Sequence, residues 1–407
     1  TFRKDFEALD RVGGPLQALR RGGWERFAAH GIPTTREEGW RFTDLAPLSK
    51  QAFAHGRPSK NGIASAKGGI APGLVFVDGH YRADLSAPPK GVEVASLAEA
   101  VRKDPGLAEG LGAAGEGEPF VALNAAFLED GAFLRVRKGF RLPVPLHLLF
   151  VGTSKAAHPR NLYLIEEGAE AVVVETYASA GEAMHLTNAV SDVRVGKGAS
   201  LAHYRLQLEG ASFHLGAVRA RIARDGRFVS HNVVTGGVLT RNDITGSLEG
   251  ENGHCTLNGL MLLRGTQHAD NYTRLEHRMP HCESHELYKG VLDDRASGVF
   301  TGRIHVYPDA QKTDAYQASA NLLLTDTATV DSQPQLEIYA DDVKCSHGST
   351  VGQLDPEALF YLRSRGLDEV AARHLLVRAF AGDVADRLDI AAVRQRVDGI
   401  LAERLGG

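Results

Sequence analysis

The chain has 407 residues, of which 43% are hydrophobic and 24% charged, with a formal net charge of −4. These values are ordinary for a folded globular protein, and the small negative charge excludes a basic body built to bind nucleic acid. No stretch approaches the roughly 18 apolar residues of a membrane span, and the first residues lack the apolar core of a signal peptide. Three cysteines are a poor basis for a disulfide framework. We therefore expect a protein of the reducing cytoplasm that binds neither nucleic acid nor membrane.

The N-terminal part, residues 1–130, is expected to be mainly helical with a few strands. Pro15 precedes an amphipathic pattern that ends at Gly31, as in a helix with a proline near its start and a glycine after its end. The stretch 59–73 is rich in Gly, Ser and Ala and predicts a surface connection. The apolar run 74–79 predicts a strand and its exit turn.

From about residue 131, short runs of Val, Ile and Leu alternate with glycine-containing turns. Four turns are similar to one another, and their glycines stand 30, 28 and 27 residues apart, at Gly168, Gly198, Gly226 and Gly253. Near-uniform spacing of this kind is the mark of a stacked repeat. Because the repeated units are short strands, the pattern predicts a β-solenoid over residues 131–352. The spacing loosens after Gly253, and a β-sandwich with regular turns is the alternative.

The last part, residues 353–407, is expected to be helical. Asp355 and Pro356 form a helix start, and Gly366 ends that helix. A second amphipathic helix follows over 368–382, and a third closes the chain. Such helices either cap the end of a solenoid or offer a docking element to a partner, and the pattern alone leaves both interpretations open.

The sequence lacks the common signatures of enzymes. It has no Walker-type phosphate loop, no HExxH, no GxSxG and no glycine fingerprint between a strand and a helix. We therefore expect a chain that is not itself an enzyme.

The most suggestive segment is 336–352, LEIYADDVKCSHGSTVG. If it is extended, side chains two residues apart share a face, so that Cys345 and His347 lie about 7 Å apart on one side. A thiolate and an imidazole at this spacing can bind one transition metal, or the imidazole can lower the pKa of the thiol. Two ligands do not make a closed site, however, and a cysteine near a strand end is more often a small buried apolar residue.

A second cluster of metal-binding residue types occupies 276–286, EHRMPHCESHE. Its candidate ligands are His277, His281, Cys282, Glu283 and His285. The density resembles that of a transition-metal site, but Pro280 interrupts any helix that would align the ligands. A polar turn between strands is the alternative interpretation.

Long motifs connect this sequence to a known family. The run 286–352, which contains GVFTGRIHVYPDAQKTDAYQ and ADDVKCSHGSTVG, resembles the signature region of the SufB/SufD family of iron–sulfur cluster assembly proteins. The following LFYLRSRGL at 359–367 continues the resemblance. The N-terminal REEGWRFTDL is similar to the entry motif of the SufD branch, with one glycine inserted before the tryptophan. The CSHG sequence around Cys345 also points to the SufD branch and away from SufB.

The resemblance implies a right-handed parallel β-helix with helical segments at both ends, forming a heterodimer with a SufB-type paralogue through the β-helices. It implies that His347 lies at that interface, where the nascent cluster is built, with Cys345 beside it in a less certain role. Both residues are therefore tentative metal ligands. The chain without its paralogue can pair with itself through the same surface.

The resemblance further implies that the C-terminal helices dock a SufC-type ATPase, through the residues of the matched motif, Leu359, Phe360, Tyr361, Arg363, Arg365 and Gly366. No cofactor is expected to stay bound to this chain alone, and iron or an iron–sulfur cluster would occupy the interface transiently. Two alternative functions are a homodimeric protein that binds metal by itself and a β-helix enzyme acting on polysaccharide.

Overall fold

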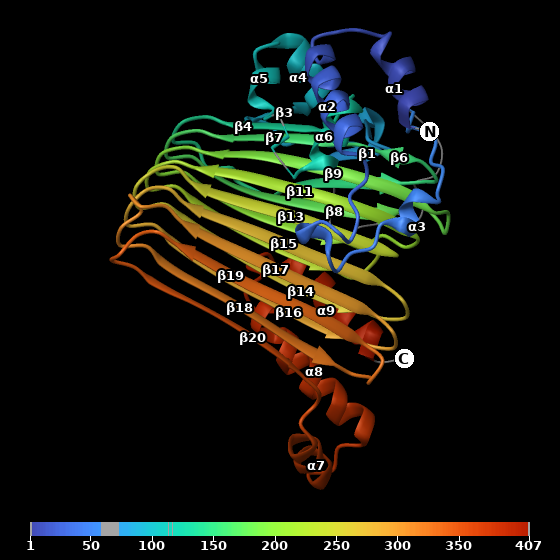
Figure 1. The fold of residues 1–407 in the computed structure, drawn as a ribbon, viewed down its shortest axis with the longest axis vertical. Helices are drawn as coiled ribbons and strands as arrows, with labels where there is room; N and C mark the ends of the chain where they lie inside the picture. The colour runs from blue at the N-terminus through green and yellow to red at the C-terminus, as the bar shows by residue number, and fades with distance from the viewer. Residues whose placement is uncertain (1, 58–72, 113, 116, 406–407) are drawn as a thin grey trace.

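The computed structural model describes residues 2–57, 73–112, 114–115 and 117–405. Apart from Gly73, the surface connection expected at 59–73 lies outside the described residues. Two ten-stranded sheets stack face to face as a β-solenoid, with helices at both ends of the chain (Figure 1). The predicted fold class is confirmed, and the β-sandwich alternative is wrong.

Successive long strands alternate between the two sheets, so that strands two apart in the chain pair in parallel. The strands of sheet A are β3 (Glu93–Ser96), β4 (Ala132–Val136), β6 (Ala156–Ala157), β7 (Arg160–Ile165), β9 (His185–Val195), β11 (Ser212–Ile222), β13 (Leu239–Leu248), β15 (His268–His277), β17 (Ser297–Val306) and β19 (Thr329–Ile338). The strands of sheet B are β1 (Leu74–Val77), β2 (His80–Tyr81), β5 (Leu146–Gly152), β8 (Glu170–Ser179), β10 (Ser200–Gln207), β12 (Arg227–Val234), β14 (His254–Leu263), β16 (Glu283–Leu292), β18 (Asp314–Leu323) and β20 (Lys344–Gly352).

The repeat is marked by one left-handed residue in each of six successive turns that lead into sheet B, from β8 to β18. These residues lie two positions before successive strands and have φ between 58° and 65°, at Gly168, Gly198, Asp225, Asn252, His281 and Lys312. The repeat therefore stays regular beyond Gly253, where the spacing of glycines had suggested that it loosens. Glycine marks only the first two turns of the series, and residues with a side chain take over the same backbone position.

Alternate side chains of every strand fill the lumen between the sheets, as the two-residue period of a strand requires. Apolar groups such as Phe228 and Phe300 form most of this inner core. Polar groups lie among them, and several are paired: Glu175 accepts hydrogen bonds from the hydroxyls of Tyr163 and Tyr177 at 2.7 and 2.8 Å. The lumen can therefore hold polar side chains, and hydrogen bonds offset the cost of burying them.

Helices of the N-terminal part cover the first strands and the outer face of sheet A (Figure 1). They are α1 (Phe2–Asp10), α2 (Gln17–His30), η1 (Glu38–Trp40), α3 (Ala46–Ser49), η2 (Ala83–Leu85), α4 (Leu97–Lys103), α5 (Leu107–Gly110) and α6 (Pro119–Ala126). The predicted helix before Gly31 is confirmed as α2, and Gly31 follows it with φ of 80°. The strand predicted at 74–79 is confirmed as β1, which joins sheet B beside β5.

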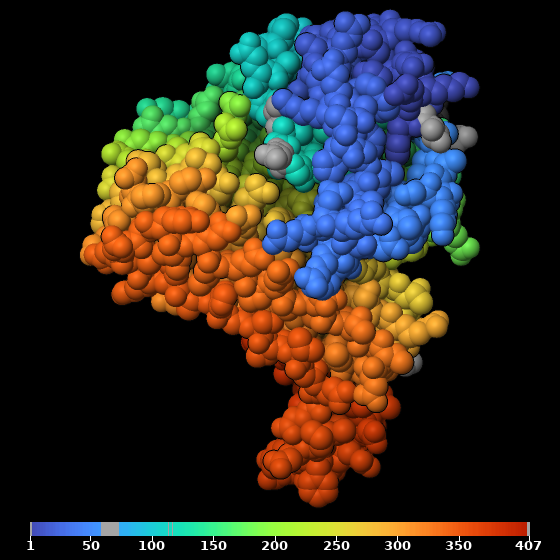
Figure 2. Space-filling model, viewed as in Figure 1, coloured from blue at the N-terminus to red at the C-terminus, as the bar shows by residue number. Residues whose placement is uncertain are grey.

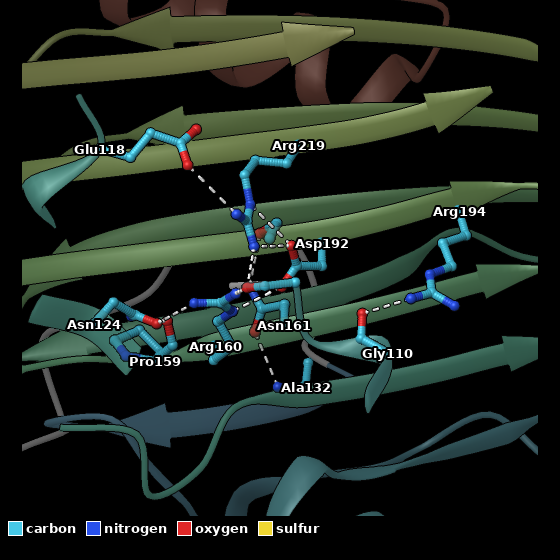
Figure 3. Close-up of polar contacts among 12 residues, drawn as sticks. Gly110, Glu118, Asn124, Ala132, Pro159, Arg160, Asn161, Asp192, Arg194 and Arg219 are labelled. Atoms are coloured by element: carbon cyan, nitrogen blue, oxygen red, sulfur yellow. Dashed lines mark hydrogen bonds and ion pairs between the residues drawn. The ribbon is translucent and has the colours of Figure 1, made fainter. Parts of the chain in front are cut away.

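Polar contacts join the N-terminal part to sheet A (Figure 3). Arg160 and Arg219 both donate to Asp192, at 2.7 and 2.6 Å, and both donate to the carbonyl of Gly112 at 2.7 Å. Glu118 lies 3.6 Å from Arg219 on the other side. Because Arg160 is fully buried, its charge depends on these partners, and the loop after α5 is fixed to the sheet.

The segment 36–48, here called the strap, crosses the outer face of sheet A. Arg241 lies between the rings of Trp40 and Tyr272, at 4.4 and 4.7 Å from their centroids. The Thr43 hydroxyl donates to Asp270 on β15. These individual contacts to the sheet hold the strap in place. The strap therefore needs no helical or strand period in its sequence, and it has none.

Three helices follow the last strand: α7 (Pro356–Ser364), α8 (Glu369–Ala385) and α9 (Ala391–Leu405). The apolar faces of α8 and α9 cover the outer face of sheet B. In contrast, α7 has no buried residue, and it projects from the end of the molecule (Figures 1 and 2). Within the described residues, no helix is both long and apolar enough to cross a membrane.

Candidate functional site at the open end of the solenoid

The two ends of the solenoid differ. At the first end, the antiparallel strands β2 and β3 terminate the sheets, and α4 packs against the adjoining strands. At the other end, β19 and β20 pair with β17 and β18 on one side only and are the last strands of their sheets. Apolar side chains are exposed there, among them Tyr339 and Val351. An unpaired parallel edge with exposed apolar side chains is a surface that another chain can cover.

Cys345 and His347 lie on β20, the last strand of this open end. Their register partners on β18 are Ala315 and Gln317, both buried in the lumen. Register partners of parallel strands share a face, so Cys345 and His347 point toward the lumen side of the last turn. Cys345 packs half-buried against the inner core, whereas His347 is exposed because no further strand covers it.

The geometry corrects one expectation for this segment. The stretch 336–352 is not one extended strand: β19 ends at Ile338, and the chain turns before β20 begins at Lys344. Cys345 and His347 therefore lie on the second of two strands in this segment. Burial raises the pKa of the Cys345 thiol, helped by the nearby Asp314 carboxylate.

The second candidate binding surface is the helix α7, none of whose residues is buried. Phe360 is 74% exposed, and the neighbouring Tyr361 is also exposed. The guanidinium of Arg365 lies 5.1 Å from the Tyr361 ring, and Arg363 pairs with Glu369 at 3.4 Å. Leu359 is half-buried, and Gly366 ends the helix with φ of 95°. Exposed aromatic side chains beside arginines are typical of protein-binding surfaces.

Comparison with known proteins gives the family. A sequence profile described as "SUF system FeS cluster assembly, SufBD core domain" matches residues 149–380. The chain belongs to the SufBD family. It is 34% identical to the iron–sulfur cluster assembly protein SufD of Escherichia coli over 93% of this chain and 90% of that protein. It is 31% identical to an iron–sulfur cluster assembly SufBD family protein of Synechocystis, over 97% and 94% of the two chains.

The SufBD core match runs from β5 into α8. It therefore contains both the open end with Cys345 and His347 and the exposed helix α7. The chain is also 28% identical to SufD of Bacillus subtilis, over 70% of this chain and 66% of that protein. The resemblance drawn from the sequence motifs is confirmed at the level of the family.

The histidine and cysteine cluster at 276–286 is dispersed by the solenoid. His281 is the left-handed residue of a turn, and His285 faces outward with its ring stacked on Tyr316 at 5.5 Å. His277 lies in the lumen, with its Nε2 atom 2.8 Å from the Ser284 hydroxyl. Cys282 is buried, and its Sγ donates to the carbonyl of Gly250 at 3.3 Å. The structure thus places these residues in a polar turn and the strands beside it.

Groups of potential metal ligands are likewise absent elsewhere in the described residues. Across the described part of the chain, no three His, Cys, Asp or Glu side chains lie together in a way that could hold a metal ion. Among the described residues Cys345 and His347 are thus a pair, and two side chains do not complete a coordination sphere.

Two lumen residues near the open end escaped the sequence reasoning. Glu286 on β16 is the register partner of Gln317 on β18, and the amide of Gln317 donates from Nε2 to the Glu286 carboxyl. Burial raises the pKa of Glu286 to about 7. Both polar residues lie in phase with the inward positions of their strands, but that their side chains meet depends on the register between β16 and β18.

Proposed function

We propose that this chain is the SufD-type subunit of a cytoplasmic scaffold that assembles iron–sulfur clusters. Membership of the SufBD family supports the general role, and the observation that carries the finer proposal is the open end of the solenoid. There an unpaired edge presents a cysteine and a histidine on one strand. The chain acts as a scaffold and not as an enzyme.

In this proposal a SufB-type paralogue covers β19 and β20, and the cluster forms between the two chains. Iron and sulfide are the substrates, held only transiently. The neutral imidazole of His347 can bind iron directly. The Cys345 thiol must first lose its proton, because burial raises its pKa; an approaching iron cation favours that loss. Groups of the partner complete the coordination that two side chains leave open.

The exposed helix α7 and the start of α8 would dock a SufC-type ATPase through Leu359, Phe360, Tyr361, Arg363, Arg365 and Gly366. A mechanical path leads from this surface to the solenoid. Lys289 on β16 donates to the carbonyl of Phe380 on α8 at 2.9 Å and pairs with Asp383. A pull on α7 and α8 by the ATPase would thus reach the strand two turns from His347 and shift the interface between the two solenoids.

The test is cluster formation in the reconstituted complex with the His347→Ala variant. Cluster formation should fall by about tenfold or more, because a direct ligand is lost, while light scattering should still show the intact complex. His285→Ala is the matched control, since His285 is an exposed histidine that faces outward on β16. Cluster formation at the normal rate in His347→Ala would show that the site is elsewhere. Tight, stoichiometric iron or zinc in the chain without partners would favour the alternative of a metal-binding homodimer.

A further inference from the structure

Glu286, Gln317 and His347 occupy successive turns of the solenoid at the same position. Glu286 pairs in register with Gln317, and Gln317 pairs in register with His347. All three belong to sheet B and share its lumen face, with neighbouring strands about 4.8 Å apart. A column of polar side chains therefore leads from the interior to the open end.

The orientation of the Gln317 amide is fixed by Glu286. Above its pKa of about 7 the Glu286 carboxyl is ionised and can only accept hydrogen bonds, so the amide must present its Nε2 atom to it, and the structure has this hydrogen bond. The other amide atom, Oε1, is left without a partner although the side chain is only 2% exposed. A buried acceptor without a donor is costly and calls for one.

Space for this amide is provided from sheet A. A methyl group on Gly302 of β17 would overlap the side-chain amide of Gln317. On the last two strands, the hydroxyls on the lumen face are those of Ser332 on β19 and Ser349 on β20, and they bond to each other at 2.8 Å. The arrangement leaves the Gln317 Oε1 atom for the imidazole in the next turn.

We propose that Glu286 and Gln317 are positioning residues for His347: Glu286 orients the Gln317 amide, whose Oε1 accepts the N–H of the imidazole. The nitrogen that carries the proton then faces the lumen, and the nitrogen with the lone pair faces the open end, where a metal ion can reach it. A hydrogen bond to the second ring nitrogen is the usual means of fixing a metal-binding tautomer. The inference deepens the proposed function of His347 and rests on it for its biological meaning.

The experiment reads the His347 tautomer directly, by nitrogen NMR of the full chain labelled at its histidine rings, at pH 8. His347→Ala identifies the resonances. The wild-type ring should be held in one neutral tautomer, and Gln317→Leu should shift its two nitrogen resonances toward those of a free imidazole. In the swapped variant, Glu286→Gln with Gln317→Glu, the amide at position 286 donates to the carboxylate at position 317. That carboxylate still has an acceptor oxygen for the His347 imidazole, so the variant should restore the wild-type resonances.

Asn321→Leu is the matched control. Asn321 lies on β18 with Gln317, is equally buried and also has an unpaired side-chain oxygen, but its register partner is Val351. Its replacement should leave the His347 resonances unchanged. Unchanged resonances in Gln317→Leu would overturn the inference, whatever happens to cluster formation. If they shift as expected while His347→Ala still builds clusters normally, the positioning stands and it is the proposed function of His347 that fails.

Discussion

Glu286 lies in the lumen on β16, where burial raises the pKa of its carboxyl from the ordinary 4.5 to about 7. The folded state thus binds this proton more tightly than the unfolded chain does. The stability that depends on this proton is complete below about pH 4.5 and is lost as the pH rises through 7. Above pH 7 the loss amounts to at most about 3 kcal/mol.

The Glu286→Gln variant should therefore be more stable than the wild type at pH 8, by up to about 3 kcal/mol. The difference should be much smaller at pH 5, where the wild-type carboxyl is protonated in the folded state. Urea unfolding at the two pH values measures both free energies. Glu251→Gln, at an exposed turn residue, is the control and should change little at either pH. A Glu286→Gln effect of equal size at both would contradict the raised pKa.

Individual site residues differ in how far the sequence could reveal them. Cys345 and His347 could be singled out because they stand two apart in a strand-forming segment with a recognisable motif. Glu286 and Gln317 could not, because their meaning depends on the register between β16 and β18, 31 residues apart in the chain. The second histidine cluster was dense in sequence only, since its members point to opposite faces of the sheet or sit in a turn.

At the scale of single elements, α7 stands out because its aromatic residues contact solvent. Phe360 is 74% exposed, so Phe360→Ser should change the free energy of unfolding by no more than about 0.5 kcal/mol. If α7 docks the ATPase, the same change should weaken that binding by about tenfold or more, as loss of an aromatic anchor does. Calorimetric titration of the chain with the SufC-type ATPase measures it.

Phe140→Ser is the control for this helix. Phe140 is also exposed, but it lies in the turn between β4 and β5, outside the C-terminal helices. Its replacement should leave the affinity for the ATPase unchanged. Equal affinity of Phe360→Ser and the wild type would move the docking surface away from α7.

The helices and the strap show which elements a sequence can predict. α2, α7 and α8 have caps or terminating glycines that mark their ends, and the apolar run of β1 likewise gives its position. The strap has neither a period nor caps, because tertiary contacts such as Trp40 on Arg241 determine its path. α8 and α9 cover the outer face of sheet B and leave the open end of the solenoid free. The sequence pattern could not predict this, because helices that capped the end would bury the same apolar faces.

At the scale of the whole molecule, the solenoid was predictable because a regular spacing of turns repeats along the chain. The spacing of glycines did not reveal the later turns of the solenoid. There His281 and Lys312 take the left-handed position that Gly168 and Gly198 hold earlier. Which end is open depends on what each terminal segment covers. The N-terminal part adds strands and helices to the first end, whereas no segment in the described part of the chain covers β19 and β20.

This asymmetry gives the last prediction. Without its paralogue, the chain should pair with itself through the open end and appear as a dimer in light scattering. Val351 on β20 is 50% exposed, so Val351→Glu should leave the monomer folded, but it would place a carboxylate in the contact. Since an unpaired buried charge is costly, the variant should be monomeric and should also bind the SufB-type paralogue less tightly.

Val144→Glu is the matched control for this prediction, because Val144 is 53% exposed and lies just before β5, far from the open end in the stacking order. It makes the same chemical change at the same exposure and should leave both kinds of pairing intact. A Val351→Glu protein that remains dimeric would show that self-association uses another face. In that case only the paralogue would be expected to cover the open edge. The affinity of Val351→Glu and Val144→Glu for the paralogue would then show whether it binds there.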